Sequence, residues 1–282
     1  MTTSPTARLR SILSGTGCLV PAPVYDPITA RLAQSIGFEM GMVGGSSVAA
    51  SVLAAPDLIL LTLTELADQI RRMTRASALP LLIDADHGYG NALNVMRCVN
   101  ELELAGAAGM TLEDTHLPAQ WHAEPSLIAV AEAVDKLTAA IAARTHPDFV
   151  IVARTSLSFS DLDDVVQRAK AYAAAGADAI FIHGSASPEA LDAIGSAAHL
   201  PLIVGSGGSL TPERLSDLAA RNVKIALPGH QPLHGAIAAM DQALRALRDP
   251  QTAMPALATP QLRGDAVRQD EFKTLTARYL KG

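Results

Sequence analysis

The sequence predicts an α/β fold, a (β/α)8 TIM barrel that carries an extra C-terminal helix. The chain contains eight short apolar runs, each too short and too continuously apolar for an amphipathic helix, as is typical of parallel strands buried on both faces. Segments with the apolar spacing of helices separate these runs. Strand and helix therefore alternate eight times, which favours a barrel over the alternative, a doubly wound sheet.

The predicted strands and helices follow one another along most of the chain. The strands are Cys18–Tyr25, Glu39–Gly45, Pro80–Asp86, Gly109–Thr115, Phe149–Thr155, Asp178–Gly184, Pro201–Ser206 and Val223–Gly229. The helices between and after them are Ile28–Ile36, Thr64–Ala76 with Thr64 as its N-cap, Ala92–Ala105, Pro125–Thr145, Leu162–Ala175, Pro188–Ala198, Pro212–Ala220 and Leu233–Leu247.

A helix is also expected at each end of the chain. Ser4 as N-cap, Pro5 at the first position and Gly15 as the stop predict the first one. The segment Asp249–Pro260 is rich in proline, alanine and threonine, as linkers are, and a last helix is predicted over Gly264–Leu280.

We therefore expect two parts, a barrel domain of residues 1–248 and a linker with the C-terminal helix, residues 249–282. A barrel does not need a ninth helix on a linker. That helix would close the barrel bottom, cover its top or pack on a neighbouring subunit.

Composition excludes several classes of protein. Apolar residues make up 49% of the 282 residues, the net charge is −6 and no basic run appears, which argues against disorder and against a nucleic-acid partner. No apolar run reaches the roughly eighteen residues of a membrane span, and the start lacks a signal-peptide core. The two cysteines, Cys18 and Cys98, lie far apart, which predicts a reduced, cytoplasmic compartment.

Two carboxylates follow the third predicted strand. Asp84 and Asp86 come directly after Leu81-Leu-Ile83 and precede a glycine-rich turn. Residues two apart on a strand point to the same face, so the two carboxylates are expected side by side at the end of a buried strand. Such a pair is costly unless a cation offsets its charge. An ordinary N-cap or surface turn is the alternative reading of the two residues.

More polar residues fall at the ends of other predicted strands. In a barrel these ends and the loops after them form one rim, which holds the active site. Asp57 lies in the loop after the second strand, and Glu113 and Arg154 end the fourth and fifth. We predict a Mg²⁺ site, with Mn²⁺ as a substitute, because hard cations prefer carboxylate oxygens. Asp86 or Asp84 would bind the metal directly, while Asp57 and Glu113 would hold coordinated waters.

Arg154 emerges from a buried strand and needs an anionic partner. We favour a substrate carboxylate over the alternative, a structural ion pair with Asp84 or Glu113. The glycine-rich segment Gly205–Ser209 could cradle a phosphate, although such a segment is just as often only a turn.

These motifs resemble those of the isocitrate lyase/phosphoenolpyruvate mutase superfamily. Asp84-Ala-Asp-His-Gly-Tyr-Gly-Asn91 is similar to the superfamily's Asp-x-Asp-x-Gly-Tyr-Gly signature, and Glu113-Asp114 and Ala153-Arg-Thr155 match its next two signatures. The resemblance covers about residues 8 to 248. It implies a Mg²⁺-dependent enzyme that forms or breaks bonds beside the carbonyl of a 2-oxo acid. It also implies a homotetramer whose neighbouring subunits exchange the last helix.

Within the superfamily the chain looks most like the oxaloacetate decarboxylase branch. The stretches that carry this likeness are Gly44-Gly-Ser46, Val52–Asp57, Ala85–Arg97, Leu117–Gln120 and Pro228-Gly-His230. The loop after the fourth strand has neither the cysteine of the lyases nor the lysine of the mutase. Ser156 stands where related sequences often carry an asparagine or an acid, and Gly205–Gly208 is unlike the tyrosine-containing segment of that branch.

The resemblance implies decarboxylation of oxaloacetate, or a close 2-oxo diacid, to pyruvate and carbon dioxide through an enolate that the metal stabilises. Arg154 and His230 would be catalytic and bind the substrate. Backbone N–H groups of Gly45, Ser46 and Ser47 would hold its 1-carboxylate. Two other functions stay open: a carbon–carbon lyase acting on a 2-hydroxy diacid of the methylisocitrate or 2-alkylmalate type, and a non-catalytic sensor of dicarboxylates.

Overall fold

The computed structural model describes residues 3–118, 124–205, 208–249 and 251–280. Eight parallel strands form one sheet in the order β1 to β8. A parallel bridge between Ile225 of β8 and Leu19, just before β1, closes the sheet. The predicted (β/α)8 barrel is therefore confirmed. The strands are β1 (Ala22–Pro23), β2 (Gly41–Val43), β3 (Leu81–Asp84), β4 (Gly109–Glu113), β5 (Val150–Ser156), β6 (Ala179–His183), β7 (Leu202–Gly205) and β8 (Val223–Leu227).

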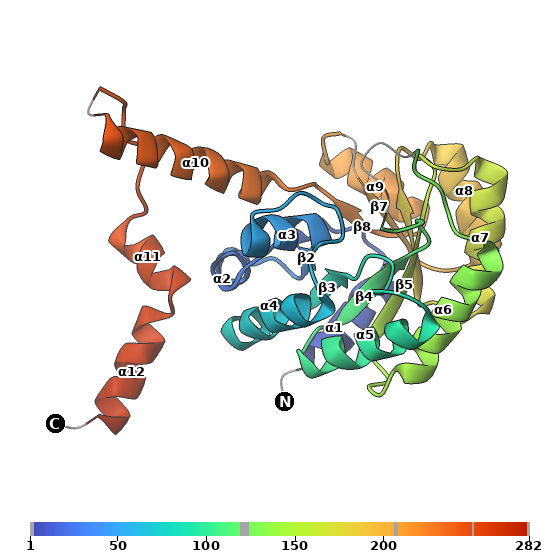
Figure 1. Ribbon diagram of the computed structural model, residues 1–282, viewed down its shortest axis with the longest axis horizontal. Helices are drawn as coiled ribbons and strands as arrows, with labels where there is room; N and C mark the ends of the chain where they lie inside the picture. Colours follow the sequence, from blue (N-terminus) through green and yellow to red (C-terminus); the bar gives the residue numbers. More distant parts are fainter. Residues whose placement is uncertain (1–2, 119–123, 206–207, 250, 281–282) are drawn as a thin grey trace.

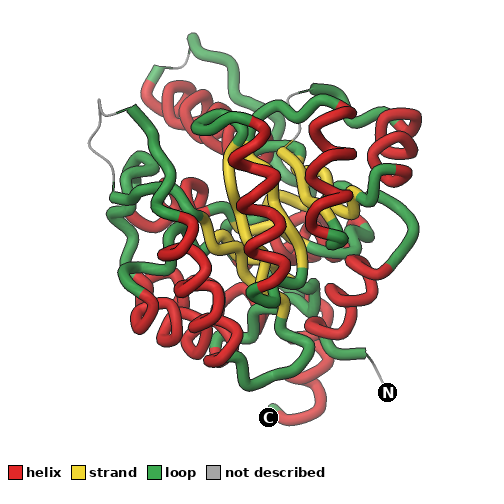
Figure 2. Tube along the Cα trace, turned by 90° about the vertical axis from the view of Figure 1, so that its right-hand side faces the viewer, coloured by secondary structure: helices red, strands yellow, loops and turns green. Residues whose placement is uncertain are grey.

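Side chains alternate between two cores along each strand. Leu81 and Ile83 of β3 pack in the core between the sheet and the surrounding helices, whereas Leu82 between them packs in the barrel interior. The same alternation along β5 turns Val150 and Val152 inward. Figure 2 shows the strands enclosed by helices. This alternation decides which residues at the strand ends face the barrel axis.

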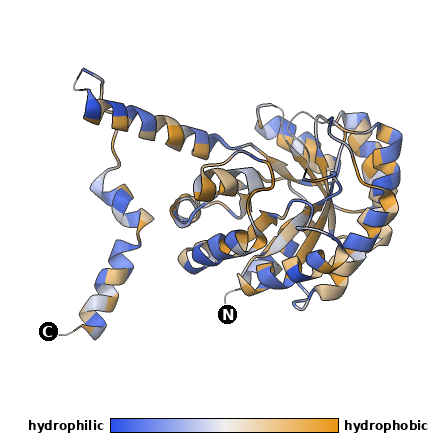
Figure 3. Cartoon of the chain, in the orientation of Figure 1, coloured by the Kyte–Doolittle hydropathy of each residue, from blue (hydrophilic) through white to orange (hydrophobic). Residues whose placement is uncertain are grey.

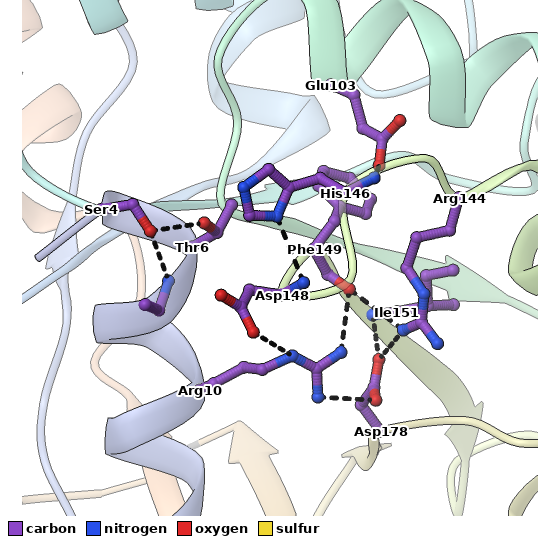
Figure 4. A network of polar contacts seen from close by, with 11 residues as sticks. Ser4, Thr6, Arg10, Glu103, Arg144, His146, Asp148, Phe149, Ile151 and Asp178 are labelled. Atoms are coloured by element: carbon purple, nitrogen blue, oxygen red, sulfur yellow. Dashed lines mark hydrogen bonds and ion pairs between the residues drawn. The ribbon is translucent and has the colours of Figure 1, made fainter.

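Helix α1 (Pro5–Ser14) closes the bottom of the barrel, where the strands begin. Its Leu9 and Leu13 are buried in the interior core. Arg10 donates to Asp178 Oδ1 at 3.0 Å and to the carbonyl oxygen of Phe149 at 3.2 Å, as Figure 4 shows. The barrel bottom, one of the three positions considered for the last helix, is therefore occupied by the first helix.

Most helices of the barrel start at a side-chain cap. The predicted N-cap Thr64 is wrong, because Thr62 accepts the N–H of Glu65 and the Glu65 carboxylate accepts the N–H of Thr62. The helices that surround the strands are α2 (Pro27–Ile36), α3 (Gly45–Leu53), α4 (Leu63–Ala76), α5 (Ala92–Leu104), α6 (Val130–Ala143), α7 (Leu162–Ala174), α8 (Pro188–Ala198) and α9 (Pro212–Ala220).

Two of these helices differ from the prediction. Helix α3 was not predicted, because its run of small residues, Gly45-Ser-Ser-Val-Ala-Ala-Ser51, lacks an amphipathic pattern. Helix α6 begins at Val130 rather than at Pro125. The segment before it is extended, since the N–H of His116 donates to the carbonyl oxygen of Ser126 at 2.8 Å.

The last three helices form an arm that leaves the barrel (Figure 1). Helix α10 (Gln231–Arg248) follows β8, yet none of its residues is buried. The single helix predicted over Gly264–Leu280 is instead two, α11 (Pro260–Ala266) and α12 (Gln269–Tyr279), separated where Arg268 adopts a φ of 56°. Helix α11 contacts α2. Among the described residues, no helix has the length and apolarity needed to cross a membrane.

Candidate active site

A cavity of about 520 Å³ opens at the carboxyl ends of the strands. Five of the predicted site residues line it: Ser46, Asp57, Asp84, Arg154 and His230. The other four, Gly45, Ser47, Asp86 and Glu113, are buried immediately behind this lining. The structure therefore brings all nine residues to one end of the barrel, although they come from separate strands and loops.

Strand alternation explains this convergence for β3, β4 and β5. Asp84 follows Leu82 by two residues and Arg154 follows Val152 by two, so both continue the inward-facing rows of their strands. Arg154 Nη1 lies 2.8 Å from Asp84 Oδ2, and its Nε lies 3.0 Å from Glu113 Oε2. The structural ion pairs considered for Arg154 are thus present, while the same side chain also lines the cavity.

Asp86 does not continue the strand, contrary to the prediction. Strand β3 ends at Asp84, and Asp86 adopts a left-handed backbone conformation with a φ of 48°. A Cβ at Gly45 would lie 2.7 Å from Asp86 Oδ1, so the carboxylate packs directly against the start of α3. The two carboxylates meet because the chain turns, not because they share a strand face.

Negative charge is concentrated around a single guanidinium. Burial raises the pKa of Asp86 well above its usual range, and the charges of Asp84, Glu113 and Asp57 raise it further. Burial also raises the pKa of Glu113 to about 7, against the lowering effect of Arg154. Four carboxyl groups and one arginine leave an excess of negative charge in a buried site.

This donor set fits a divalent cation that prefers oxygen ligands. Within the described residues, no group of three or more His, Cys, Asp and Glu side chains is arranged to hold a metal ion together. Magnesium does not need such a group, because it usually keeps several waters and binds one or two carboxylates. Asp84 and Asp57 line the cavity, whereas Asp86 and Glu113 are each only 8% exposed.

His230 is held over the start of α3 by two hydroxyl groups. Ser47 Oγ lies 2.8 Å from Nδ1 and Ser46 Oγ lies 3.3 Å from Nε2. A Cβ at Gly44 would lie 2.8 Å from the ring, so this position requires glycine. Burial lowers the pKa of His230, and the nearby His234 lowers it further. The lowered pKa favours a neutral imidazole at neutral pH.

The backbone N–H groups predicted to bind a carboxylate lie in the first turn of α3. The N–H of Ser47 is already engaged, because it donates to the carbonyl oxygen of Gly44 at 3.1 Å. The N-cap, Gly44, supplies no side-chain acceptor. Within the described residues, the N–H groups of Gly45 and Ser46 are therefore left for an anion at this helix N-terminus.

Phe181 and His183 also line the cavity, although neither was among the predicted site residues. Phe181 lies under the Arg154 guanidinium, 5.1 Å from it, and His183 follows at the end of β6. The period of two along β6 was the signal that could have found them, since both continue an inward-facing row. Of the segment Gly205–Ser209, residues 206 and 207 lie outside the described residues, and of Leu117–Gln120 the last two do.

Asp114 does not join the cavity, although it is next to Glu113. It faces the helix layer, where its Oδ2 accepts from Thr155 Oγ1 at 2.8 Å, from Arg168 Nη1 at 3.1 Å and from the Tyr172 hydroxyl. This buried network fixes β4 and β5 from outside the barrel.

Comparison with known proteins places this site in a family. The model of the phosphoenolpyruvate phosphomutase family matches residues 9–248, which cover the barrel and its rim. The chain belongs to this family. The predicted resemblance to the isocitrate lyase/phosphoenolpyruvate mutase superfamily is thus confirmed.

Several similar proteins are named for reactions of small acids. A protein of Bradyrhizobium diazoefficiens named oxaloacetate decarboxylase is 49% identical over 280 residues, covering 97% of this chain and 96% of the relative. A phosphonopyruvate hydrolase solved with oxalate and Mg²⁺ is 28% identical, with a TM-score of 0.85 over 99% of this chain and all of the other. A 2,3-dimethylmalate lyase is 27% identical, with a TM-score of 0.85 over 99% of each chain.

Proposed function

We propose that the protein is a Mg²⁺-dependent oxaloacetate decarboxylase that releases pyruvate and carbon dioxide. The observation that carries this choice of reaction is the 49% identity, over nearly the whole chain, to a relative of that name. The cavity supports it, because carboxylates, an arginine and a neutral histidine surround a space large enough for a small diacid. The same rim supports an enzyme better than a passive sensor.

The metal would be held by the carboxylates of the rim. Asp84 lines the cavity and is the favoured direct ligand, while Asp86, Glu113 and Asp57 would hold its waters. A bound divalent cation supplies Lewis-acid stabilisation of the negative charge that develops on the substrate carbonyl oxygen. Its positive charge also offsets the excess of carboxylates, which would otherwise favour protonation of Asp86 and Glu113.

The protein's own groups would bind and orient the substrate. The N–H groups of Gly45 and Ser46 at the start of α3 would bind the 1-carboxylate, since a helix N-terminus favours anions. Arg154, held by Asp84 and Glu113, would present its remaining edge to a substrate carboxylate. His230, oriented by the hydroxyls of Ser46 and Ser47, would hydrogen-bond a substrate oxygen.

We also propose that four chains assemble and that the arm packs on a neighbouring subunit. Helix α10 carries the apolar residues Ile237, Met240, Leu244 and Leu247 on one side, exposed by between 49% and 75%. Figure 3 shows hydrophobic positions along α10, the helix that stands away from the barrel. An apolar stripe of this length is costly in water, so a partner surface is expected to cover it.

The likeness to a 2,3-dimethylmalate lyase favours one rival, cleavage of a carbon–carbon bond in a 2-hydroxy diacid. Product analysis separates the two reactions. Purified protein with Mg²⁺ is incubated with oxaloacetate, and in parallel with malate, 2,3-dimethylmalate and methylisocitrate. The proposal predicts pyruvate and carbon dioxide from oxaloacetate alone. Formation of a 2-oxo acid together with a second acid or carbonyl compound from a 2-hydroxy diacid would instead establish the lyase.

A further inference from the structure

His183, at the end of β6, lines the cavity and is fixed on two sides. Ser156 Oγ lies 3.0 Å from its Nδ1, and the ring of Phe159 lies 5.6 Å from the imidazole. Among the described residues, Nε2 has no hydrogen-bond partner. This nitrogen is therefore the polar atom of the ring that a ligand in the cavity can reach.

The hydrogen bonds of Ser156 decide which nitrogen of His183 carries the proton. Ser156 is 2% exposed, and its Oγ accepts the backbone N–H of Ser158 at 3.1 Å. Within the described part of the chain, the only acceptor for the Ser156 hydroxyl hydrogen is Nδ1 of His183. Because Oγ already accepts one N–H, this arrangement favours donation of the hydroxyl hydrogen to Nδ1, which places the proton of the neutral ring on Nε2.

The surroundings favour this neutral ring over the imidazolium. Burial lowers the pKa of His183, and the positive charge of Arg154 from β5 lowers it further. Asp84 of β3 acts in the opposite direction but is itself paired with Arg154. Among the residues that the structure describes, no carboxylate contacts Nδ1, where an acid would stabilise the charged form.

We propose that Ser156 is a positioning residue that holds His183 as a neutral imidazole, which offers its Nε2–H to the leaving carboxylate of a 2-oxo diacid. This inference rests on the proposed function. In the reaction the C3–C4 bond breaks, its electron pair passes to the C2 oxygen as an enolate, and the carboxylate leaves as neutral carbon dioxide. A proton from water later converts the enolate to pyruvate.

A neutral donor suits this step for an electrostatic reason. The leaving carboxylate loses its negative charge as the reaction proceeds. A charged imidazolium there, added to the positive charge of Arg154, would stabilise the bound substrate more than the transition state, which lowers KM but slows turnover. A neutral N–H orients the carboxylate with much less of this penalty.

The tautomer of His183 can be read directly by ¹⁵N NMR on the resting Mg²⁺-supplemented protein near pH 7.5. A His183→Asn variant identifies the resonance. The proposal predicts an Nε2–H tautomer in the wild type, its loss to a mixture in Ser156→Ala and its return in Ser156→Thr, which keeps a hydroxyl. An imidazolium or an Nδ1–H tautomer in the wild type would overturn it.

The kinetic test introduces an acid beside Nδ1. In Ser156→Asp the imidazolium should be favoured, so KM and kcat for oxaloacetate should each fall about tenfold. Raising the pH should not restore kcat, because the remaining ring proton stays on Nδ1 beside the introduced carboxylate and Nε2 has no N–H to offer. An unchanged or increased kcat with a charged His183 would overturn the proposal. If Ser156→Asp does not fold, the alanine and threonine variants still test the tautomer. The NMR result does not depend on turnover, so it remains decisive even if oxaloacetate is not the substrate.

Discussion

At the scale of single residues, Gly45 determines how closely α3 approaches the carboxylates. Because a Cβ there would lie 2.7 Å from Asp86 Oδ1, Gly45→Ala must displace the carboxylate or the helix. Overpacking of this kind costs about 1–3 kcal/mol, so we expect kcat/KM to fall about tenfold or more and the Mg²⁺ concentration for half activity to rise. Gly17→Ala is the matched control, since no atom lies within 4 Å of its added Cβ. Equal kcat/KM and equal Mg²⁺ requirement in the two variants would contradict the packing argument.

The buried carboxyl groups make stability depend on pH and on the metal. Burial raises the pKa of Glu113 from 4.5 to about 7, so between these values the folded protein binds more protons than the unfolded chain. Without a divalent cation, the free energy of unfolding should therefore decrease as the pH rises from about 5 to 8.

Magnesium should reverse part of this loss, because a bound cation favours the ionised carboxylates. Thermal unfolding in EDTA and in Mg²⁺ at pH 6 and pH 8 tests this, and the gain in Tm from Mg²⁺ should be larger at pH 8. A gain that is equal at both pH values, or larger at pH 6, would count against a metal held by these carboxylates.

At the scale of elements, Asp178 joins α1 to the strands at the barrel bottom. Its carboxylate accepts from Arg10, from Arg144 Nη1 at 2.7 Å and from the N–H of Ile151 at 2.8 Å (Figure 4). Asp178→Ala leaves these donors without their acceptor and should lower the free energy of unfolding by about 3 kcal/mol. Urea denaturation measures this, while kcat should stay near the wild-type value because the network lies at the opposite end of the barrel from the cavity.

The sequence predicted the strands better than it predicted two of the helices. The strands were recognisable because both of their faces are buried, which leaves continuous apolar runs. Helix α3 was not predicted because its small residues pack without an amphipathic pattern. Helix α6 begins later than predicted because the segment before it is extended. The break between α11 and α12 depends on the left-handed backbone at Arg268, which residue type does not reveal.

At the scale of the whole molecule, the arm should determine assembly. Leu244→Glu places a charge in the apolar stripe of α10 and should convert a tetramer into smaller species, as measured by light scattering. Ala238→Glu is the control, since this exposed residue lies on the opposite side of the same helix. A wild-type protein that is monomeric at micromolar concentration would contradict the proposed assembly.

The position of the site was predictable once the barrel fold had been predicted. In a barrel, polar residues that end different strands meet at one rim, which placed Asp84, Glu113 and Arg154 together. The detailed contacts were not predictable. The turn at Asp86 and the use of the Ser46 and Ser47 hydroxyls to orient His230 depend on three-dimensional packing across segments that are distant in sequence.

The most direct test of the central claim is the release of pyruvate from oxaloacetate by the purified protein, with Mg²⁺ and with EDTA, measured against Mg²⁺ alone. The metal-only reaction is needed because free divalent ions decarboxylate oxaloacetate themselves. We predict release far above this background with Mg²⁺, and a loss of about a hundredfold or more in Asp84→Asn and in Asp86→Ala. Release no faster than the metal-only background from folded, Mg²⁺-supplemented protein would contradict the account, as would full Mg²⁺-dependent turnover in Asp86→Ala.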